Sequence, residues 1–346
     1  MTKFNLTAAV IGTGYIGTQH LEALKMLVSK VIVCNADVEK GKAVAEKYGC
    51  RFYADYEEMF KQEKLDFVNI CVPTPMHCKI ALSALEHGIN VLCEKPFTST
   101  LEEAYLVTQK AKEKNLALMV AHCVRFSRKY EYLRRCIADG RFGKLLSLEL
   151  YRDGPKPAWS TGGWLLDIEK SGGVVRDVHV HDTDIVKFLL GMPESVYTKG
   201  SALCCTTLFD YGDDKLVSAT ASWRNASSFP FSPGFEAAFE NGVMKLHDNK
   251  FLLYTDNTVT EDPHLAEEFD SCMKHGNLVT NEIDYFCQCL AKGEKNDRCS
   301  ADDICESFAI SFAESESMKT NRIIKTSRGY QRLFTYSPGV IPMILL

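Results

Sequence analysis

The sequence predicts an α/β protein of two parts: a parallel sheet wound with helices, followed by an α+β unit. Three observations predict it. The chain has 346 residues, which is long enough for two domains. Short apolar runs alternate with helical patterns up to about residue 121, as in right-handed βαβ units. Beyond that point, strand patterns recur roughly every ten residues with short polar turns, which is typical of an antiparallel sheet with one covered face.

The composition excludes several classes of protein. Apolar residues make up 46% of the chain and charged residues 25%, and the net charge of −5 leaves no basic footprint for nucleic acid. No apolar run approaches the roughly eighteen residues of a membrane span, and the N-terminus lacks a signal-peptide pattern. The 14 cysteines are scattered, without paired CxxC motifs at zinc spacing. We therefore expect reduced thiols, a cytoplasmic protein, and no membrane or nucleic-acid partner.

A glycine-rich turn follows the first apolar run. Leu6–Ile11 is predicted to be a buried strand, and a helical pattern begins near Ile16. The turn between them reads G-x-G-x-x-G, in the strand–turn–helix context that dinucleotide binding requires. Its glycines permit a tight turn and a close approach to a pyrophosphate; the alternative is a glycine turn of purely structural use. The residues predicted to bind a cofactor here are Gly12, Thr13, Gly14, Tyr15, Ile16 and Gly17.

The end of the next strand bears on which cofactor is expected. Val31–Cys34 is an apolar strand pattern followed directly by Asn35, with Asp37 two positions later. A carboxylate at such a position binds the ribose hydroxyls and disfavours a 2′-phosphate. Asn35 would not repel a phosphate, but no arginine follows it. We expect Asn35 and Asp37 to contact the cofactor, with NAD favoured and NADP as the alternative.

The rest of the first half continues the alternation of helix and strand. Glycines and prolines mark several element ends, such as Gly49 and Gly88. The predicted helices are Val38–Tyr48, Tyr56–Lys61, one that ends at Leu85, and Leu101–Lys114; the predicted strands are Leu65–Val72, Gly88–Cys93 and Leu116–Val120. The first, dinucleotide-binding domain is expected to span residues 1–122, and the second residues 123–346.

The strand Gly88–Cys93 stops at Glu94, Lys95 and Pro96. A charged pair at the carboxyl end of such a strand lies where open α/β sheets bind their ligands. Lysine suits a reaction there, because desolvation or a neighbouring cation lowers its pKa and lets it exchange a proton near neutral pH. The alternative is a surface salt bridge at a strand end.

The second half is predicted to be α+β. A helix over Arg128–Asp139 comes first. The predicted strands are Lys144–Arg152, Ser195–Leu208, Lys215–Trp223, Gly234–Glu240, Val243–His247 and Lys250–Tyr254, and helices over Leu278–Ala291 and Ala301–Lys319 are expected to cover the sheet. The tail Ser327–Leu346 receives no assignment.

One stretch of the second half carries chemistry. A helix is predicted from about Asp177 to Leu190, which would place Asp177 and His181 one turn apart on one face. An acid in that position can orient the histidine and raise its pKa. One alternative is a helix whose polar residues face solvent or a domain seam. Another is a metal site of His179, His181 and a carboxylate, which is disfavoured because a His-x-His pair on a helix points in two directions; we predict no metal.

Several of these motifs occur together in a known order. They are Gly12-x-Gly14-x-x-Gly17-x-x-His20, Cys71-Val72-Pro73-Thr74-Pro75-x-His77, Glu94-Lys95-Pro96, Arg125-Phe126 and Gly172-Gly173-x-x-x-Asp177-x-x-x-His181-x-x-Asp184. Over about residues 5–325 the chain resembles the Gfo/Idh/MocA family, that of glucose–fructose oxidoreductase and inositol dehydrogenase. The resemblance implies an N-terminal Rossmann domain and a C-terminal α+β domain built on a large, mostly antiparallel open sheet. In the family that sheet packs against a partner subunit, which implies a homodimer or homotetramer.

The resemblance also implies a reaction, a hydride transfer between nicotinamide and a carbinol carbon of a sugar, cyclitol or related polyol. Lys95 would bind the substrate hydroxyl, His181 would be the acid/base, and Asp177 would orient it or bind a neighbouring hydroxyl. The residues implied to line the nicotinamide side are Cys71, Pro73, Thr74, His77, Glu94 and Lys95. The residues expected to bind substrate are Lys95, Arg125, Tyr151, Arg152, Trp164, Asp177 and His181, with Trp159 and Asp167 in the same loop.

Three functions remain open from the sequence. The first is an NAD(P)-dependent sugar or polyol dehydrogenase with free turnover of cofactor. The second keeps NAD tightly bound, oxidises a sugar transiently, and cleaves a glycoside or passes the hydride to a second sugar. The third is a non-catalytic, nucleotide-sensing regulatory protein; the joint presence of Lys95, Asp177 and His181 disfavours it.

Overall fold

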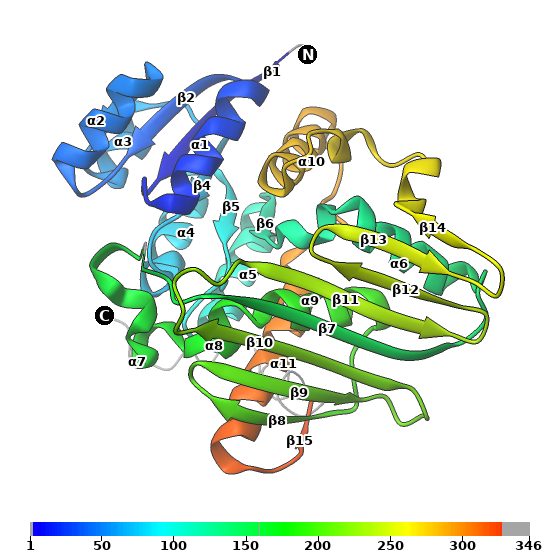
Figure 1. Ribbon diagram of the computed structural model, residues 1–346. Coiled ribbons are helices and arrows are strands. Elements are labelled where there is room, and N and C mark those ends of the chain that lie inside the picture. Colours follow the sequence, from blue (N-terminus) through cyan, green and yellow to red (C-terminus); the bar gives the residue numbers. More distant parts are fainter. Residues whose placement is uncertain (1–2, 159, 327–346) are drawn as a thin grey trace.

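The computed structural model describes residues 3–158 and 160–326, which form two sheets with their helices. Figure 1 shows the first sheet at the upper left, in blue and cyan, and the second below it, mostly in green and yellow. Trp159 and the tail Ser327–Leu346 lie outside the described residues. Within the described ranges, no helix is both long and apolar enough to cross a bilayer.

The first sheet is parallel and has the strand order β3-β2-β1-β4-β5-β6. Its strands are β1 (Phe4–Ile11), β2 (Val28–Cys34), β3 (Arg51–Tyr53), β4 (Phe67–Ile70), β5 (Asn90–Glu94) and β6 (Leu118–Ala121). The helices between them are α1 (Tyr15–Leu27), α2 (Val38–Tyr48), α3 (Tyr56–Gln62), α4 (His77–Glu86) and α5 (Leu101–Lys114). This order is that of a Rossmann fold, with its switch point between β1 and β4. The predicted parallel sheet is confirmed; only the short edge strand β3 was missed.

Segments from the end of the chain return to the first sheet. Helix α10 (Leu278–Lys292) places Ile283 and Phe286 in the apolar core on the α1 side of the sheet. Helix α11 (Ala301–Thr320) places Ile304 and Phe308 in the core on the other side, near α5. Residues far beyond position 122 thus complete the apolar cores on both faces of the first sheet. The domain boundary at residue 122 therefore stays a prediction.

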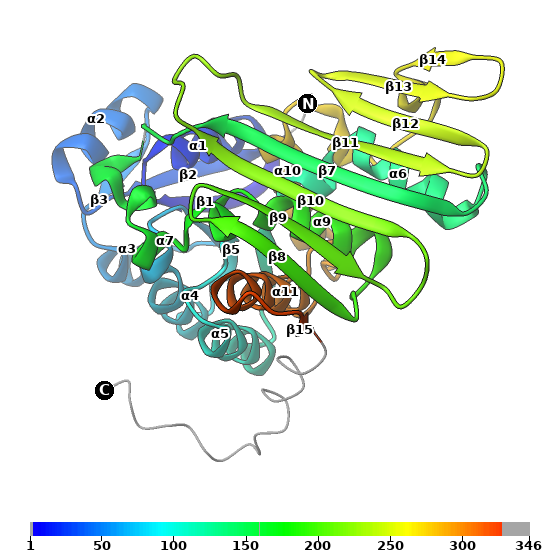
Figure 2. The ribbon, with the colours of Figure 1, turned by 60° about the horizontal axis from the view of Figure 1, so that its bottom comes forward.

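Within residues 3–158 and 160–326, the second sheet has nine strands in the order β14-β13-β12-β11-β7-β10-β9-β8-β15. They are β7 (Leu145–Pro155), β8 (Ser195–Ser201), β9 (Cys204–Asp210), β10 (Leu216–Arg224), β11 (Ser232–Phe239), β12 (Gly242–His247), β13 (Lys250–Tyr254), β14 (Val259–Glu261) and β15 (Ile324–Lys325). Among these described strands only the β7–β10 pair is parallel, so the mostly antiparallel sheet is confirmed. Figure 2 shows α6 (Arg128–Asp139) and α9 (Val180–Leu190) behind this sheet and α11 below β8 at its lower edge, with the other face of the sheet toward the viewer.

Two sequence predictions about this half are wrong. The single strand predicted over Ser195–Leu208 is a hairpin, because β8 and β9 pair with each other around a turn that contains no glycine or proline. The helix predicted from about Asp177 to Leu190 begins later, as α9 at Val180, and Asp177 is instead the last residue of a separate short helix, α8 (Gly173–Asp177), which follows α7 (Ile168–Ser171). The break leaves the carbonyl of Asp177 free to bond outside its own helix.

Candidate active site

The glycine-rich turn after β1 is shaped as a cradle for a phosphate group. Gly12 has φ +93°, and a Cβ there would lie 2.6 Å from the carbonyl oxygen of Cys71. A Cβ on Gly17 would lie 2.0 Å from the carbonyl oxygen of Gly12, whereas one on Gly14 would meet nothing within 4 Å. The turn is therefore tight toward the protein and open at Gly14, directly before the N-terminus of α1. Backbone N–H groups at a helix start bind anions, so these residues fit a dinucleotide pyrophosphate.

The end of β2 separates the roles of Asn35 and Asp37. The amide of Asn35 donates a hydrogen bond to the hydroxyl of Thr13, so it lies against the glycine-rich turn. The carboxylate of Asp37 instead caps α2, accepting from the backbone N–H of Lys40 at 3.1 Å. Of the two residues predicted to contact a ribose, Asn35 is thus the one beside the cradle. Tyr15, at the start of α1, has an exposed side chain.

The turn after β4 is braced from within by His77. Its Nε2 lies 2.8 Å from the carbonyl oxygen of Val72, and its Nδ1 lies 3.1 Å from that of Pro96. Burial lowers the pKa of His77, although these carbonyl groups act in the opposite direction. His77 therefore joins the turns after β4 and β5 instead of facing an open site. Among its neighbours, Cys71 and Thr74 are buried and Pro73 is exposed.

Lys95 lies between the two domains at the end of β5. Its Nζ donates to the backbone oxygen of Asp177 at 2.9 Å and to the carboxylate Oδ1 of Asp177 at 3.2 Å. The carboxylate of Glu94 accepts from the backbone N–H of Lys95 at 3.0 Å and from His20 at 2.9 Å. Burial favours a higher pKa for Glu94, but the hydrogen bond and charge of His20, with the Lys95 charge, bring it below its usual range. The break between α8 and α9 supplies the carbonyl that Lys95 binds.

His181, in the first turn of α9, completes the group. Its side chain is only partly covered, but Nδ1 is buried and has no hydrogen-bond partner in the part of the chain that the structure describes. Burial lowers its pKa well below the ordinary range, and the charges of Lys95 and Arg152 act in the same direction. The expectation that Asp177 raises this pKa is wrong, because Asp177 is bound to Lys95. A neutral imidazole is the form that can accept a proton.

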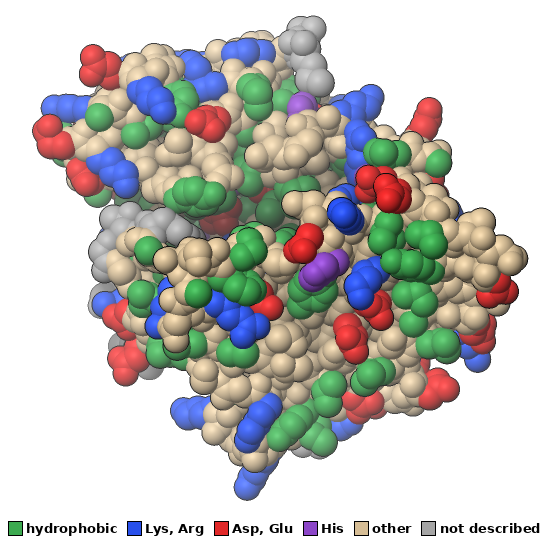
Figure 3. Space-filling view, in the orientation of Figure 1, with side chains coloured by type: hydrophobic (Ala, Val, Ile, Leu, Met, Phe, Trp, Pro, Cys, Tyr) green, Lys and Arg blue, Asp and Glu red, His purple; other side chains and the backbone are tan. Residues whose placement is uncertain are grey.

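The sequence prediction missed His122, which follows β6 directly. Its ring lies 6.3 Å from that of His181, edge to face at 79°. Its Nδ1 lies 3.4 Å from the carboxylate of Asp184, and burial lowers its pKa although Asp184 opposes this. Its position at the carboxyl end of a parallel strand was the available signal. Figure 3 shows a hollow between the two lobes, on the side where these strand ends meet the second domain.

Two predicted substrate ligands, Arg152 and Arg125, are bound to buried carboxylates. Arg152, 4% exposed, donates to the buried carboxylate of Asp182 at 2.8 Å, and Arg125, 1% exposed, forms a two-point pair with Asp184 at 2.7 and 2.8 Å. Both guanidinium groups are thus occupied by buried carboxylates. Trp164 is partly buried in a small apolar cluster.

Tyr151 and His179 are also turned away from this group. Alternate residues of a strand face opposite sides of its sheet. Arg152 is buried on the side that the helices cover, so Tyr151 lies on the uncovered face of the second sheet. Its hydroxyl donates to the backbone oxygen of Leu246 at 2.7 Å. His179 is fully buried, with Nε2 3.0 Å from the hydroxyl of Thr207. It therefore does not join His181 as a ligand pair.

The structure predicts a stabilising role for Arg125. Arg125→Met should lower the free energy of unfolding by about 3–5 kcal/mol, because Asp184 would remain buried without its partner. Urea denaturation measures this. Arg51→Met removes a partly exposed pair with Glu63 and should cost about 1 kcal/mol at most. If Arg125→Met has unchanged stability but a raised KM for substrate, Arg125 binds substrate as the sequence predicts.

Comparison with known families gives matches to both halves of the chain. Residues 6–122 match a family described as "Oxidoreductase family, NAD-binding Rossmann fold", and residues 130–245 match the "GFO/IDH/MocA C-terminal domain". Both matches agree with the fold and with the cradle at the glycine-rich turn.

Curated relatives cover part of the chain. It is 34% identical over 218 residues to scyllo-inositol 2-dehydrogenase (NAD(+)) of Bacillus subtilis, covering 61% of this chain and 62% of that one. It is 32% identical over 193 residues to 2,7-anhydro-N-acetylneuraminate hydratase of Mediterraneibacter gnavus, covering 56% and 51%. The chain thus spans about half the length of the hydratase and under two thirds of the dehydrogenase.

Solved structures share the fold over nearly the whole chain. Levoglucosan dehydrogenase in complex with NADH and levoglucosan has a TM-score of 0.80 at 20% identity, covering 93% of this chain and 99% of that one. An oxidoreductase from Agrobacterium radiobacter, in complex with NAD+, L-tartaric acid and magnesium, has a TM-score of 0.81 at 18% identity, with the same coverage. At these identities, the likeness demonstrates the fold.

Proposed function

Because the chain belongs to the Gfo/Idh/MocA family of NAD-binding oxidoreductases, we propose that it transfers a hydride between nicotinamide and a carbinol carbon of a sugar, cyclitol or related polyol. One observation carries the proposal. Lys95, from the first domain, binds Asp177 of the second, and the neutral His181 lies in the field of the Lys95 charge. A cation, a carboxylate and a neutral base thereby meet at the edge of a dinucleotide-binding sheet. The inositol and levoglucosan dehydrogenases among the similar proteins support this substrate class.

The residues present can divide the work of alcohol oxidation. Lys95 donates a hydrogen bond to the substrate oxygen and stabilises the negative charge that develops there. His181 accepts the hydroxyl proton, for which its neutral form is required. Asp177 holds the Lys95 side chain in position, and it can accept from a neighbouring hydroxyl. NAD, when bound, supplies the hydride acceptor, and the protein supplies position and charge.

The choice of cofactor should respond to Asn35. Asn35→Asp should shift the ratio of kcat/KM for NAD over that for NADP upward by roughly tenfold or more, because a carboxylate beside Thr13 repels a 2′-phosphate. Steady-state kinetics with both cofactors measure the ratio. Asp37→Asn alters the helix cap instead and serves as the matched control. An unchanged ratio in Asn35→Asp would indicate that Asn35 does not face the ribose.

A second candidate keeps NAD bound throughout the reaction. Two relatives are named hydratases, of Mediterraneibacter gnavus and of Escherichia coli, and a hydratase adds water without net oxidation. Transient oxidation of a sugar carbon would acidify the neighbouring C–H and permit elimination or addition there. Lys95, Asp177 and His181 would serve that chemistry equally well. A nucleotide-sensing protein without catalysis remains the least favoured function, since all three residues are present together.

Freshly purified protein distinguishes these candidates. Nucleotide released by denaturation is measured first, and a panel of sugars and cyclitols is then assayed with NAD and with NADP at neutral pH. An empty protein that reduces added NAD with one polyol class would support the dehydrogenase. Stoichiometric NAD without net reduction of any kind would support the bound-cofactor reaction. The same panel is also examined for sugar products by chromatography, and cofactor binding with neither net reduction nor any altered sugar would contradict both.

We also propose an oligomer formed through the second sheet, and a cytoplasmic location. The sheet's uncovered face carries Tyr151 and the exposed side chains of Leu208 and Leu216, which a partner subunit could cover. All 14 cysteines are free thiols in the described residues, as a reducing compartment would require. Sedimentation measures the oligomer. Substituting Leu208 and Leu216 with lysine should shift it toward the monomer.

A further inference from the structure

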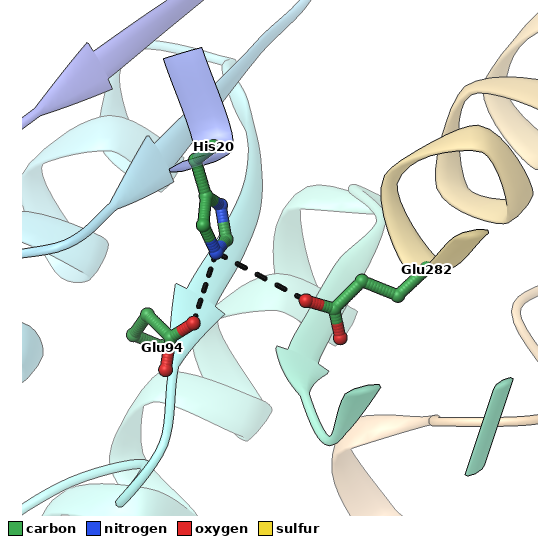
Figure 4. Close-up of side chains that lie close together, drawn as sticks. All are labelled: His20, Glu94 and Glu282. Carbon is green, nitrogen blue, oxygen red and sulfur yellow. Dashed lines mark hydrogen bonds and ion pairs between the residues drawn. The ribbon is translucent and has the colours of Figure 1, made fainter. Parts of the chain in front are cut away.

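Three side chains from distant parts of the chain meet in the interior beneath Lys95. Figure 4 shows His20 of α1 pointing toward Glu94 at the end of β5 and Glu282 of α10. The Nε2 atom of His20 lies 2.9 Å from Oε1 of Glu94 and 4.0 Å from Oε1 of Glu282. One donor atom from each residue lies within 4.8 Å of the other two. The proposed reaction uses neither His20 nor Glu282.

Glu282 is the unexplained member of this cluster. Its side chain is 0% exposed, and both carboxylate oxygens are buried with no hydrogen-bond partner among the described residues. Within the described ranges, neither Glu94 nor Glu282 forms an ion pair with a lysine or arginine side chain. Two buried carboxylates this close need compensation, because burial penalises each charge and the charges repel each other. The compensation must come from a proton or from a cation.

One atom of a neighbouring amide also lacks a partner. The Nδ2 atom of Asn69, in β4, lies 3.0 Å from Nδ1 of His20, whereas its Oδ1 is buried without a hydrogen bond to any described residue. A histidine that binds a metal through Nε2 carries its proton on Nδ1 and donates it to an oxygen. Turning the Asn69 amide by 180° would place Oδ1 against Nδ1 and satisfy both atoms. Asn69 thus has the position of an outer partner to a metal-bound His20.

We propose that His20, Glu94 and Glu282 bind a divalent metal ion of the zinc type in a closed structural site. Imidazole nitrogen and carboxylate oxygen are ordinary zinc ligands, and a two-oxygen contact from Glu282 would bring the donors to four. Ligands about 2.0–2.1 Å from zinc lie roughly 3.3–3.5 Å apart in a tetrahedron, a value bracketed by the two distances from His20. The two carboxylate charges would cancel those of the ion.

Such an ion would join α10 to the N-terminal part of the chain beside the candidate active site. Its ligands come from α1, β5 and α10, so it would fix the returning C-terminal helix to the Rossmann sheet. Glu94 would bind the ion through one oxygen while its other oxygen keeps the hydrogen bond from the Lys95 backbone. The ion has a positioning role here, and the proposal does not depend on the substrate or cofactor of the enzyme.

Metal analysis of the full-length protein tests the site. We expect about one equivalent of zinc in protein purified without chelator, and a lower Tm after chelation that added Zn²⁺ restores. Added Co²⁺ should give the visible bands of a four-coordinate ion, without the thiolate charge-transfer band that cysteine ligands would produce. Asn69→Ala should weaken Zn²⁺ binding by roughly 10–100-fold. The metal content and the Co²⁺ spectrum are both measured on the unaltered protein, so neither result depends on whether a variant folds.

Glu282→Gln is the decisive variant, because it keeps the shape of the side chain and removes its charge. It should lose the bound metal and the response of Tm to Zn²⁺. Asp284→Asn is the matched control, since Asp284 is buried on the same helix but binds His275 at 2.6 Å. If Asp284→Asn contains as much metal as the unaltered protein while Glu282→Gln has lost it, the result supports the site. Three outcomes overturn the proposal: no saturable Zn²⁺ or Co²⁺ binding, which leaves Glu282 as a protonated acid; a thiolate spectrum; or undiminished binding by Glu282→Gln.

Discussion

Lys95→Ala is expected to lower kcat/KM by about 10³-fold or more while NAD still binds. The structure gives one reason for the loss of activity and another for the retained binding of NAD. The Nζ atom is the one cation brought to the carboxylate of Asp177, at 3.2 Å, among the site contacts described above. Its removal takes away both the hydrogen bond to the substrate oxygen and the charge that stabilises it. The glycine-rich cradle is built from other strands, so the nucleotide should remain bound. Single-turnover kinetics and fluorescence titration with NADH measure the two effects separately.

A surface lysine provides the control for this experiment. Lys112→Ala removes a side chain from α5 that pairs with Asp302 on the surface, and it should leave both kcat/KM and NADH binding unchanged. Full activity in Lys95→Ala would eliminate the assigned role. Loss of NADH binding together with activity would instead mean that Lys95 mainly holds the cofactor or the turn after β5.

His181→Ala is expected to lower kcat by on the order of 10²–10⁴, the usual contribution of a general acid or base. In the native protein, burial and the charges of Lys95 and Arg152 hold the pKa of His181 well below its ordinary value. The neutral, proton-accepting form therefore persists as the pH falls through the ordinary histidine value of about 6.5. The acid limb of the pH–rate profile should lie below that value, and it should disappear in His181→Ala.

The same pKa direction has a consequence for stability. His181 binds a proton more readily in the unfolded protein than in the folded protein. Lowering the pH below about 6.5 therefore favours the unfolded state and reduces the free energy of unfolding. His181→Ala should therefore show a smaller fall of Tm between neutral and mildly acid pH than the original chain. His87→Ala, at an exposed position on the surface of the first domain, should change neither the rate profile nor this slope. An acid limb that persists in His181→Ala would assign the titrating base to another residue, with His122 as the first candidate.

Local sequence patterns predicted most of the first domain. The bounds of α2 and α5 agree with the predicted ranges Val38–Tyr48 and Leu101–Lys114. Each has a side-chain cap at its start and a left-handed residue at its end, Gly49 and Asn115. These signals lie within a few residues of the structure that they specify, so a single sequence displays them. The glycine-rich turn was recognised in the same way, because its glycine spacing lies directly between a strand pattern and a helical pattern. Its close contact with Cys71, in contrast, arises only in the folded sheet.

The second domain was predicted less well, because its decisive signals are not local. The turn between β8 and β9 has no glycine or proline, and only strand pairing reveals it. The helix predicted from Asp177 to Leu190 begins only at Val180, and Asp177 ends the separate helix α8, where its carbonyl accepts from Lys95. Tertiary contacts outweighed local propensity in both places.

The sequence by itself determined the parallel sheet, the cradle and the types of residue at the candidate site, including Lys95, Asp177 and His181. Tertiary structure alone decided which of the other polar residues join them. It buried Arg125 against Asp184, turned Tyr151 to the opposite face of its sheet, and brought His122 beside His181. The physical reason is range: periodicity and capping act over a few residues, whereas Lys95 and Asp177 are 82 positions apart and meet only through the packing of two sheets.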